Sequence, residues 1–285
     1  MRSEEEVIAL ILHVANQDDR IRAVLLTGSK ANPAAVKDIF QDFDIIYIVT
    51  QLESFVKNRY WIDIFGERLI LQLPEEMIVG DKGNTSFHYL MLFKDGNRID
   101  LTLFPLDKLR TEFKRDSLTT LLLDKDNLFE TLPPPGDTDY LIKLPTEKEF
   151  MDCCNEFWWV STYVGKGLWR KQIPYAKEMM EIPVRTTFLK IIEWYIGTKT
   201  DFKVSFGKSG RNMTHYISSD LYHRILSTYA DSNVDNIWNS LFLMADLFDD
   251  LANKIAKSMS FSYKATEAKN VTEYLKSIHA ASIEK

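Results

Sequence analysis

Cysteine is scarce in this chain of 285 residues, and the two cysteines that occur, Cys153 and Cys154, are adjacent. Neighbouring cysteines rarely form a structural disulfide, so we expect a reducing compartment and two thiols packed as small apolar groups on a helix. Long apolar runs are also missing, because none approaches the roughly 18 to 20 residues of a membrane span. The acidic N-terminus lacks the apolar stretch of a signal peptide. The sequence therefore predicts a soluble, cytoplasmic protein with no membrane partner.

Several common functional signatures are absent as well. The five histidines are scattered without the spacing of a zinc site. No dinucleotide glycine fingerprint, Walker A loop or Gly-x-Ser-x-Gly elbow occurs. The formal net charge of −6 argues against a nucleic-acid partner, since such proteins usually carry a basic surface.

The composition and length predict two globular domains of ordinary size. Hydrophobic residues make up 45% of the chain and aromatic residues 12%, enough for a substantial core. The first half has the pattern of an α/β domain with a mixed sheet: an amphipathic helix, then apolar runs of strand length, two of them joined by an Asp-Gly turn. The helices are expected over residues 4–15 and 53–65, and the strands over residues 23–27, 44–49, 68–73, 87–93 and 98–104.

The second half is predicted to be helical. Three consecutive prolines, Pro133 to Pro135, interrupt the pattern, so we place one domain at residues 1–135 and the other at 136–285. A capping box between Thr146 and Glu149 predicts a helix start, and Pro183 is typical of the first turn of another helix. The expected helices cover residues 146–169, 183–197, 219–229, 234–258 and 266–279.

The most informative segment lies between the first two strands. Residues two apart on a strand face the same side, so Asp42 and Asp44 would direct two carboxylates at one point. Asp100, on a later strand, could complete a triad that binds Mg²⁺, or it could act as general base toward an acceptor hydroxyl. The sequence leaves both roles of Asp100 open.

Other candidates surround this carboxylate motif. Gly28 and Ser29 form a turn after the first strand whose N–H groups and hydroxyl could bind nucleotide phosphates, and Lys30 could add a positive charge. Lys166, near a helix end, could reach the nucleotide or simply favour the helix C-terminus. The combination predicts nucleotidyl transfer.

Aromatic and acidic residues of the second half are candidates for contacts with an acceptor. Aromatic rings at helical spacing are more often core residues than ligand contacts, and acidic clusters are more often solvated faces. With both alternatives open, the predicted contacts are Trp158, Tyr163, Glu178 and Glu181, with a further acidic cluster at Asp246, Asp249 and Asp250.

These motifs resemble the nucleotidyltransferase superfamily, whose core is similar to that of polymerase β. Longer segments resemble the aminoglycoside 6-adenylyltransferases, also called streptomycin adenylyltransferases. In the first half they are residues 19–24, 28–33, 40–45 and 97–102; in the second they are residues 156–160, 166–170 and 174–177. The sequence departs from the family at Lys30, where arginine is more usual, which keeps the charge but loses a bidentate grip on phosphate.

The resemblance implies transfer of AMP from Mg-ATP to the 6-hydroxyl of streptomycin, with release of pyrophosphate, as an antibiotic-resistance activity. It also implies Asp42 and Asp44 as metal ligands, Asp100 as the third carboxylate, and Gly28 with Ser29 as the phosphate turn. The helical domain would shape the acceptor pocket, and the protein is expected to be a monomer or weak homodimer. Two alternatives stay open: a nucleotidyltransferase acting on a macromolecule, and a nucleotide-binding module without catalysis.

Overall fold

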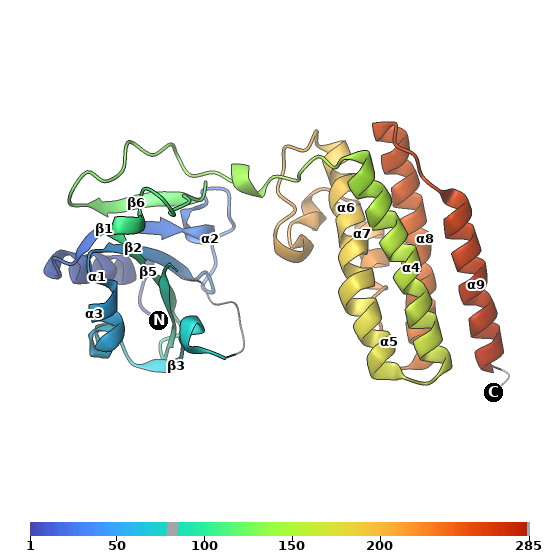
Figure 1. The fold of residues 1–285 in the computed structure, drawn as a ribbon, viewed down its shortest axis with the longest axis horizontal. Helices are drawn as coiled ribbons and strands as arrows, with labels where there is room; N and C mark the ends of the chain where they lie inside the picture. Colours follow the sequence, from blue (N-terminus) through green and yellow to red (C-terminus); the bar gives the residue numbers. More distant parts are fainter. Residues whose placement is uncertain (79–84, 284–285) are drawn as a thin grey trace. The chain divides into compact units, whose positions relative to one another are not determined.

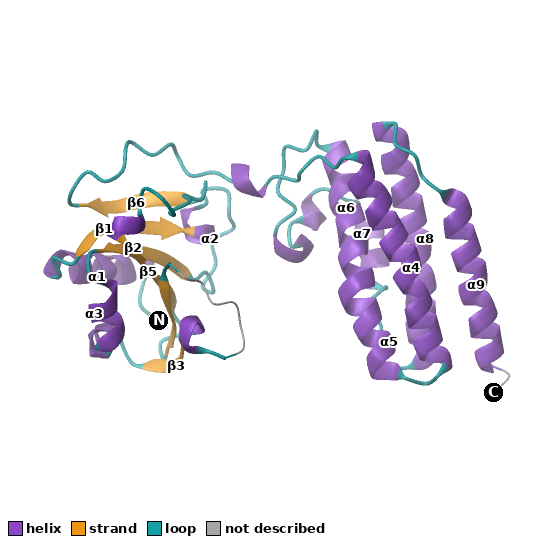
Figure 2. Ribbon diagram, in the orientation of Figure 1, coloured by secondary structure: helices purple, strands orange, loops and turns teal. Residues whose placement is uncertain are grey.

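The computed structural model describes residues 1–78 and 85–283, and the chain divides into two compact units, Met1–Asp139 and Tyr140–Lys285. The sequence places the boundary a few residues earlier, between residues 135 and 136. Among the described residues, the strands belong to the first unit and the long helices to the second (Figure 2). The predicted fold class, a mixed sheet followed by a helical domain, is confirmed.

The first unit is built on a mixed sheet with strand order β3-β4-β5-β2-β1-β6 among the described residues (Figure 1). The strands β2 and β5 run parallel, and every other neighbouring pair is antiparallel. The strands are β1 (Ile21–Thr27), β2 (Phe43–Val49), β3 (Arg68–Gln72), β4 (Phe87–Phe93), β5 (Arg98–Pro105) and β6 (Thr119–Asp124).

The two faces of this sheet differ in what covers them. Helices α1 (Glu4–Gln17) and α3 (Leu52–Lys57) supply apolar residues to a large core on one face, where alternate strand residues are fully buried. On the other face a smaller apolar cluster forms around Leu25, Ile48 and Phe104. Asp44 and Asp100 lie on this second face, near the starts of β2 and β5.

The five predicted strands are confirmed, whereas β6 was missed. Its sequence, Thr119–Asp124, has no clear alternation, because it is an edge strand paired only with β1 among the described residues. The single helix expected over residues 53–65 is instead α3 followed by a 3₁₀ helix, Tyr60–Phe65.

The second unit contains long helices around one apolar core. Thr146 and Glu149 form the predicted capping box at the start of α4, and Cys154 is buried in the core. Gly165 of α4 allows a close approach of α9, because an added Cβ would lie 2.7 Å from the side chain of Leu275. The helices are α4 (Glu147–Trp169), α5 (Ile173–Met179), α6 (Arg185–Lys199), α7 (Ser219–Leu226), α8 (Val234–Met259) and α9 (Ala265–Ile283).

The prediction for Pro183 was wrong. A π-helical segment, Met180–Val184, contains this proline and joins α5 to α6 in one continuous path, so Pro183 does not open a new helix. A π segment bonds its carbonyls to residues further along the chain, so it tolerates the missing proline N–H. None of the helices in the described ranges is long and apolar enough to cross a lipid bilayer.

Candidate active site

Three aspartates converge because β2 and β5 pair in parallel. In the register of these strands Asp44 lies directly beside Asp100, and residues at paired positions point to the same face. Asp42 lies two residues before Asp44, just ahead of β2. The structure therefore brings Asp42, Asp44 and Asp100 to one edge of the sheet.

Gly28 closes this group from the β1 side. Its φ of +69° lies in the left-handed region, and a Cβ added there would be 2.3 Å from Oδ2 of Asp44. Thr27, the preceding residue, pairs with Asp44 across β1 and β2 and donates its hydroxyl to the Asp44 carbonyl at 3.3 Å. Only glycine allows the backbone to pass this close to the carboxylate.

Burial, together with repulsion between the carboxylates, shifts the pKa values of Asp44 and Asp42. Burial, reinforced by the charges of Asp100 and Asp42, raises the pKa of Asp44 to about 6. Burial also raises the pKa of Asp42, although Arg98 and Lys30 oppose the shift. The site therefore holds more negative charge than its own cations balance.

Arg98 is the main counter-ion in this part of the sheet, and the sequence prediction missed it. Its Nε and Nη2 donate to the two carboxylate oxygens of Asp100 at 2.7 and 2.6 Å, and its Nη1 lies 3.5 Å from Asp42. The signal was available, because Arg98 precedes Asp100 by two residues on β5 and so shares its face.

The donor chemistry of this group fits a hard divalent cation. Three neighbouring carboxylates, two of them with a raised pKa, would be stabilised by a doubly charged ion with oxygen ligands. Within residues 1–78 and 85–283, however, no three Asp, Glu, His or Cys side chains already converge closely enough to hold a metal ion. Arg98 occupies both oxygens of Asp100, so a cation would have to take the place of its guanidinium.

The predicted phosphate turn forms a short helix, α2 (Gly28–Ala31), directly after β1. Gln41, just before Asp42, donates to the Ser29 carbonyl at 3.3 Å and so ties this turn to the carboxylate loop. Lys30 differs from the sequence prediction in its surroundings. Its side chain is only 7% exposed, its Nζ lies 3.4 Å from Glu4, and it sits 4.2 Å from the centre of the Phe43 ring. Lys30 therefore stabilises α1 and β2.

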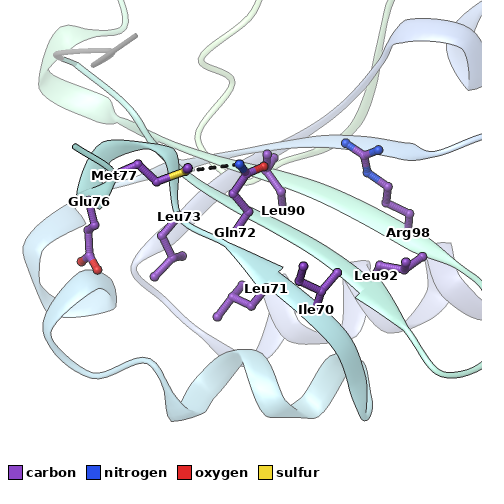
Figure 3. A pocket seen from close by; sticks show the side chains of 9 residues that line it. All are labelled: Ile70, Leu71, Gln72, Leu73, Glu76, Met77, Leu90, Leu92 and Arg98. Carbon is purple, nitrogen blue, oxygen red and sulfur yellow. Dashed lines mark hydrogen bonds between the residues drawn. The ribbon is translucent and has the colours of Figure 1, made fainter. Parts of the chain in front are cut away.

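Figure 3 shows the side chains that line an apolar depression of about 660 Å³, Arg98 among them. The pairing of β4 with β5 places this depression next to the carboxylate group. Leu90 of β4 pairs with Asp100, and Leu92 pairs with Arg98, so this hollow starts where the carboxylate group ends. Arg98 contacts the carboxylate group and also lines this depression. The lining residues come from β3, β4, β5 and the segment after β3: Ile70, Leu71, Gln72, Leu73, Glu76, Met77, Leu90, Leu92 and Arg98.

The candidates on α4 of the helical unit lie in different surroundings. Trp158 is 4% exposed and packs against Phe157 and Phe248, with its indole N–H 3.3 Å from the Tyr263 hydroxyl; one edge reaches a hollow of about 150 Å³. Tyr163 is half-buried and accepts a hydrogen bond of 2.7 Å from Trp159, which is 60% exposed.

Lys166 lies one turn beyond Tyr163 on α4. Its Nζ is 5.8 Å from the centre of the Tyr163 ring and 5.9 Å from that of Tyr274. Together with Arg170 it lines a depression of about 370 Å³ in the helical unit. The nucleotide contact predicted for Lys166 stays a prediction.

The acidic candidates split into exposed and engaged residues. Glu178 is exposed on α5. Glu181 instead pairs with Lys177 at 3.3 Å and with the buried Arg185 at 3.0 Å, so it stabilises the helix path. In the second cluster Asp249 accepts a hydrogen bond from Tyr263 and Asp250 pairs with Lys254, whereas Asp246 is exposed on α8.

Comparisons with known proteins place this chain in a family. The model of the streptomycin adenylyltransferase family matches residues 1–278. An aminoglycoside 6-adenylyltransferase of Campylobacter jejuni is 44% identical over 94% of this chain and 93% of its own length. One of Bacillus subtilis is 39% identical over 99% of both chains.

This chain also matches a solved structure. The chain is 37% identical to a Bacillus subtilis aminoglycoside 6-adenyltransferase seen in a crystal structure, with a TM-score of 0.48 over 98% of this chain and 99% of that one. The family resemblance drawn from the sequence motifs is confirmed by the full-length matches. The chain belongs to the streptomycin adenylyltransferase family and is a nucleotidyltransferase.

Proposed function

We propose that this enzyme transfers AMP from Mg-ATP to the 6-hydroxyl of streptomycin and releases pyrophosphate. The observation that carries the proposal is the convergence of Asp42, Asp44 and Asp100 beside a glycine that leaves room for nothing larger. The family to which the chain belongs, and the names of its relatives, supply the substrate class. An antibiotic-resistance role follows if this reaction is the natural one.

In this reaction the acceptor hydroxyl oxygen forms a bond to the α-phosphorus, and the bond from the α-phosphorus to the bridging oxygen breaks. The electron pair of that bond leaves with pyrophosphate, and the hydroxyl proton passes to a base. When bound, Mg²⁺ neutralises phosphate charge and lowers the pKa of the attacking hydroxyl. Asp42 and Asp44 would hold the ion.

Asp100 has two roles consistent with its position. It could be the third ligand, or it could accept the hydroxyl proton as general base. Both roles need acceptor sites on Asp100 with which the guanidinium of Arg98 competes. Ser29 would bind phosphate oxygens through its backbone N–H and hydroxyl. Gly28 would let the phosphates approach, while its own N–H donates to the Leu118 carbonyl at 3.1 Å.

We extend the proposal to the helical unit with the distinctions made above. Lys166 would contact the nucleotide phosphates, and Tyr163 and Glu178 would contact the guanidinium-bearing acceptor. Trp158 and Glu181 would support these residues chiefly through packing and ion pairing. Lys30 would act on the phosphates only after leaving Glu4 and Phe43.

The test is pyrophosphate release from ATP with Mg²⁺, compared side by side with streptomycin, kanamycin, spectinomycin and no acceptor. Release with streptomycin alone is the expected result, and EDTA should abolish it. Release with a different aminoglycoside would keep the chemistry and replace the substrate. Protein that binds Mg-ATP but releases nothing with any of these compounds would contradict the proposal and favour a macromolecular acceptor or a non-catalytic nucleotide-binding module.

A further inference from the structure

Arg98 is bound to the Asp100 carboxylate, which the proposed reaction uses as metal ligand or general base. Its guanidinium takes both carboxylate oxygens of Asp100 and extends to Asp42. A carboxylate bound in this bidentate way has few acceptor sites left for a metal ion or a substrate proton. The arrangement therefore makes Asp100 less available for either role.

The pairing is strong in geometry but not deeply buried. The Arg98 side chain is 43% exposed and that of Asp100 is 19% exposed. Ion pairs near the surface contribute little net stability. A divalent cation that binds several carboxylates at once can therefore displace the single charge of a guanidinium.

The residues around Arg98 provide a carboxylate that can bind the cation and space for the displaced Arg98 side chain. The positive charge of Arg98 acts to lower the pKa of Asp44, while the hydrogen bonds of Arg98 go to Asp100. Beside Arg98 the apolar depression of about 660 Å³ presents Leu92 and Leu90, along which an arginine stem can pack (Figure 3).

We propose that Arg98 is an exchangeable counter-ion: it occupies the carboxylate cluster when no divalent cation is bound and moves off Asp100 when the cation binds. This inference rests on the proposed function only in assuming that the cluster takes a divalent cation. Arg98 is then a positioning residue, because it acts through the carboxylates. It keeps their repulsion balanced in the free enzyme and raises the cation concentration needed to load the site.

The direct test is Mn²⁺ binding to the full chain without nucleotide, measured by the electron paramagnetic resonance signal of free Mn²⁺. Arg98→Gln should bind Mn²⁺ more tightly than the wild type by about tenfold or more, because a competing charge has been removed. Arg98→Lys should show a smaller gain, since lysine keeps the charge but loses the fork.

The matched control is Arg22→Gln. Arg22 also forms a two-pronged pair, with Asp126 at the other end of the sheet, and its loss should leave Mn²⁺ affinity unchanged. A purely structural role of Arg98 predicts equal or weaker Mn²⁺ binding in Arg98→Gln, and that result would overturn the inference. Absence of binding in both wild type and Arg98→Gln would overturn it too.

A measurement on the wild type keeps the inference testable if Arg98→Gln fails to fold. The ¹⁵N signal of the Arg98 Nε–H group, assigned by its loss in Arg98→Lys, should move on titration with Mg²⁺ and exchange faster with water. A signal that stays in place while Mg²⁺ saturates the protein would contradict the exchange.

The outcomes separate this inference from the proposed function. Tighter Mn²⁺ binding by Arg98→Gln, in a protein that transfers AMP to none of the tested aminoglycosides, would support the counter-ion and reject the substrate. Unchanged Mn²⁺ binding, in a wild type that adenylylates streptomycin, would reject the counter-ion alone.

Discussion

The two units of the chain differ in how directly their sequence predicts a function. In the sheet unit, alternate residues of one strand share a face, and strand pairing places Asp44 beside Asp100. In the helical unit, neighbouring aromatic residues serve unlike purposes: Trp158 is 4% exposed and Trp159 is 60% exposed. A short motif therefore defines a site on a sheet, whereas on a helix it predicts mainly a face.

The largest expected effect tests the sheet half of this comparison. Asp44→Asn should lower kcat by about 10³-fold or more, because the carboxylate at the centre of the group loses its charge. The fold should survive, since Asp44 is only partly buried. Steady-state pyrophosphate release and circular dichroism measure the two properties.

Asp126→Asn is the control for that substitution. Asp126 pairs with Arg22 outside the carboxylate group and should leave turnover unchanged. Substantial activity in well-folded Asp44→Asn protein would remove Asp44 from the site.

The next effect concerns the backbone beside Asp44. Gly28→Ala should reduce turnover by about 10²-fold and destabilise the fold by about 1–3 kcal/mol, because the new Cβ would meet the Asp44 carboxylate and φ is positive. Kinetics and urea unfolding measure both. Gly136→Ala, whose Cβ would meet no atom within 4 Å, should change neither; a Gly28→Ala enzyme of normal activity would mean that the close approach is not needed.

Two glutamates one turn apart sharpen the helical half of the comparison. Glu178→Gln should raise the streptomycin KM by about 3- to 10-fold without changing Tm, because Glu178 is exposed and is proposed to contact a cationic acceptor. Glu181→Gln should instead lower Tm, because it leaves the buried Arg185 without its carboxylate partner. Reversed effects would exchange the proposed roles of these residues.

The smallest effect is a dependence of stability on pH. Burial tends to raise the pKa of Asp95, but hydrogen bonds from Arg2 and Asn97 outweigh it and hold that pKa below its usual value. A depressed carboxylate pKa stabilises the fold above the unfolded-state value, near 3.9, and this stabilisation is lost as the pH falls further. Asp95→Asn should therefore show a weaker decline of Tm below about pH 4 than the wild type; identical profiles would contradict this.

Much of the sheet unit could be predicted because its signals are local. Apolar runs and the Asp-Gly turn gave five strands, and the two-residue period placed the carboxylates. The sixth strand, β6, was missed because an edge strand needs no alternation. Arg98 was missed as a partner of Asp100. The two residues are two positions apart on one strand and so share a face, but the prediction did not use this spacing.

The remaining features depend on contacts between distant residues. Lys30 contacts Glu4 and Phe43. Both lie far from Lys30 in the sequence, so the local sequence does not predict these contacts. The helix path through Pro183 depends on a π segment, which has no simple sequence signal. In the helical unit, Glu181 could be separated from Glu178 only once Arg185 and Lys177 had been placed.

We propose that this enzyme, with its three neighbouring carboxylates, transfers AMP to one hydroxyl of streptomycin. The most direct test is to isolate the product formed with Mg-ATP and streptomycin, and to locate the phosphorus by correlation with sugar-ring and cyclitol protons in the NMR spectrum. We expect a single AMP group on the 6-hydroxyl of the streptidine ring. An AMP group on another hydroxyl, or transfer of phosphate in place of AMP, would contradict it.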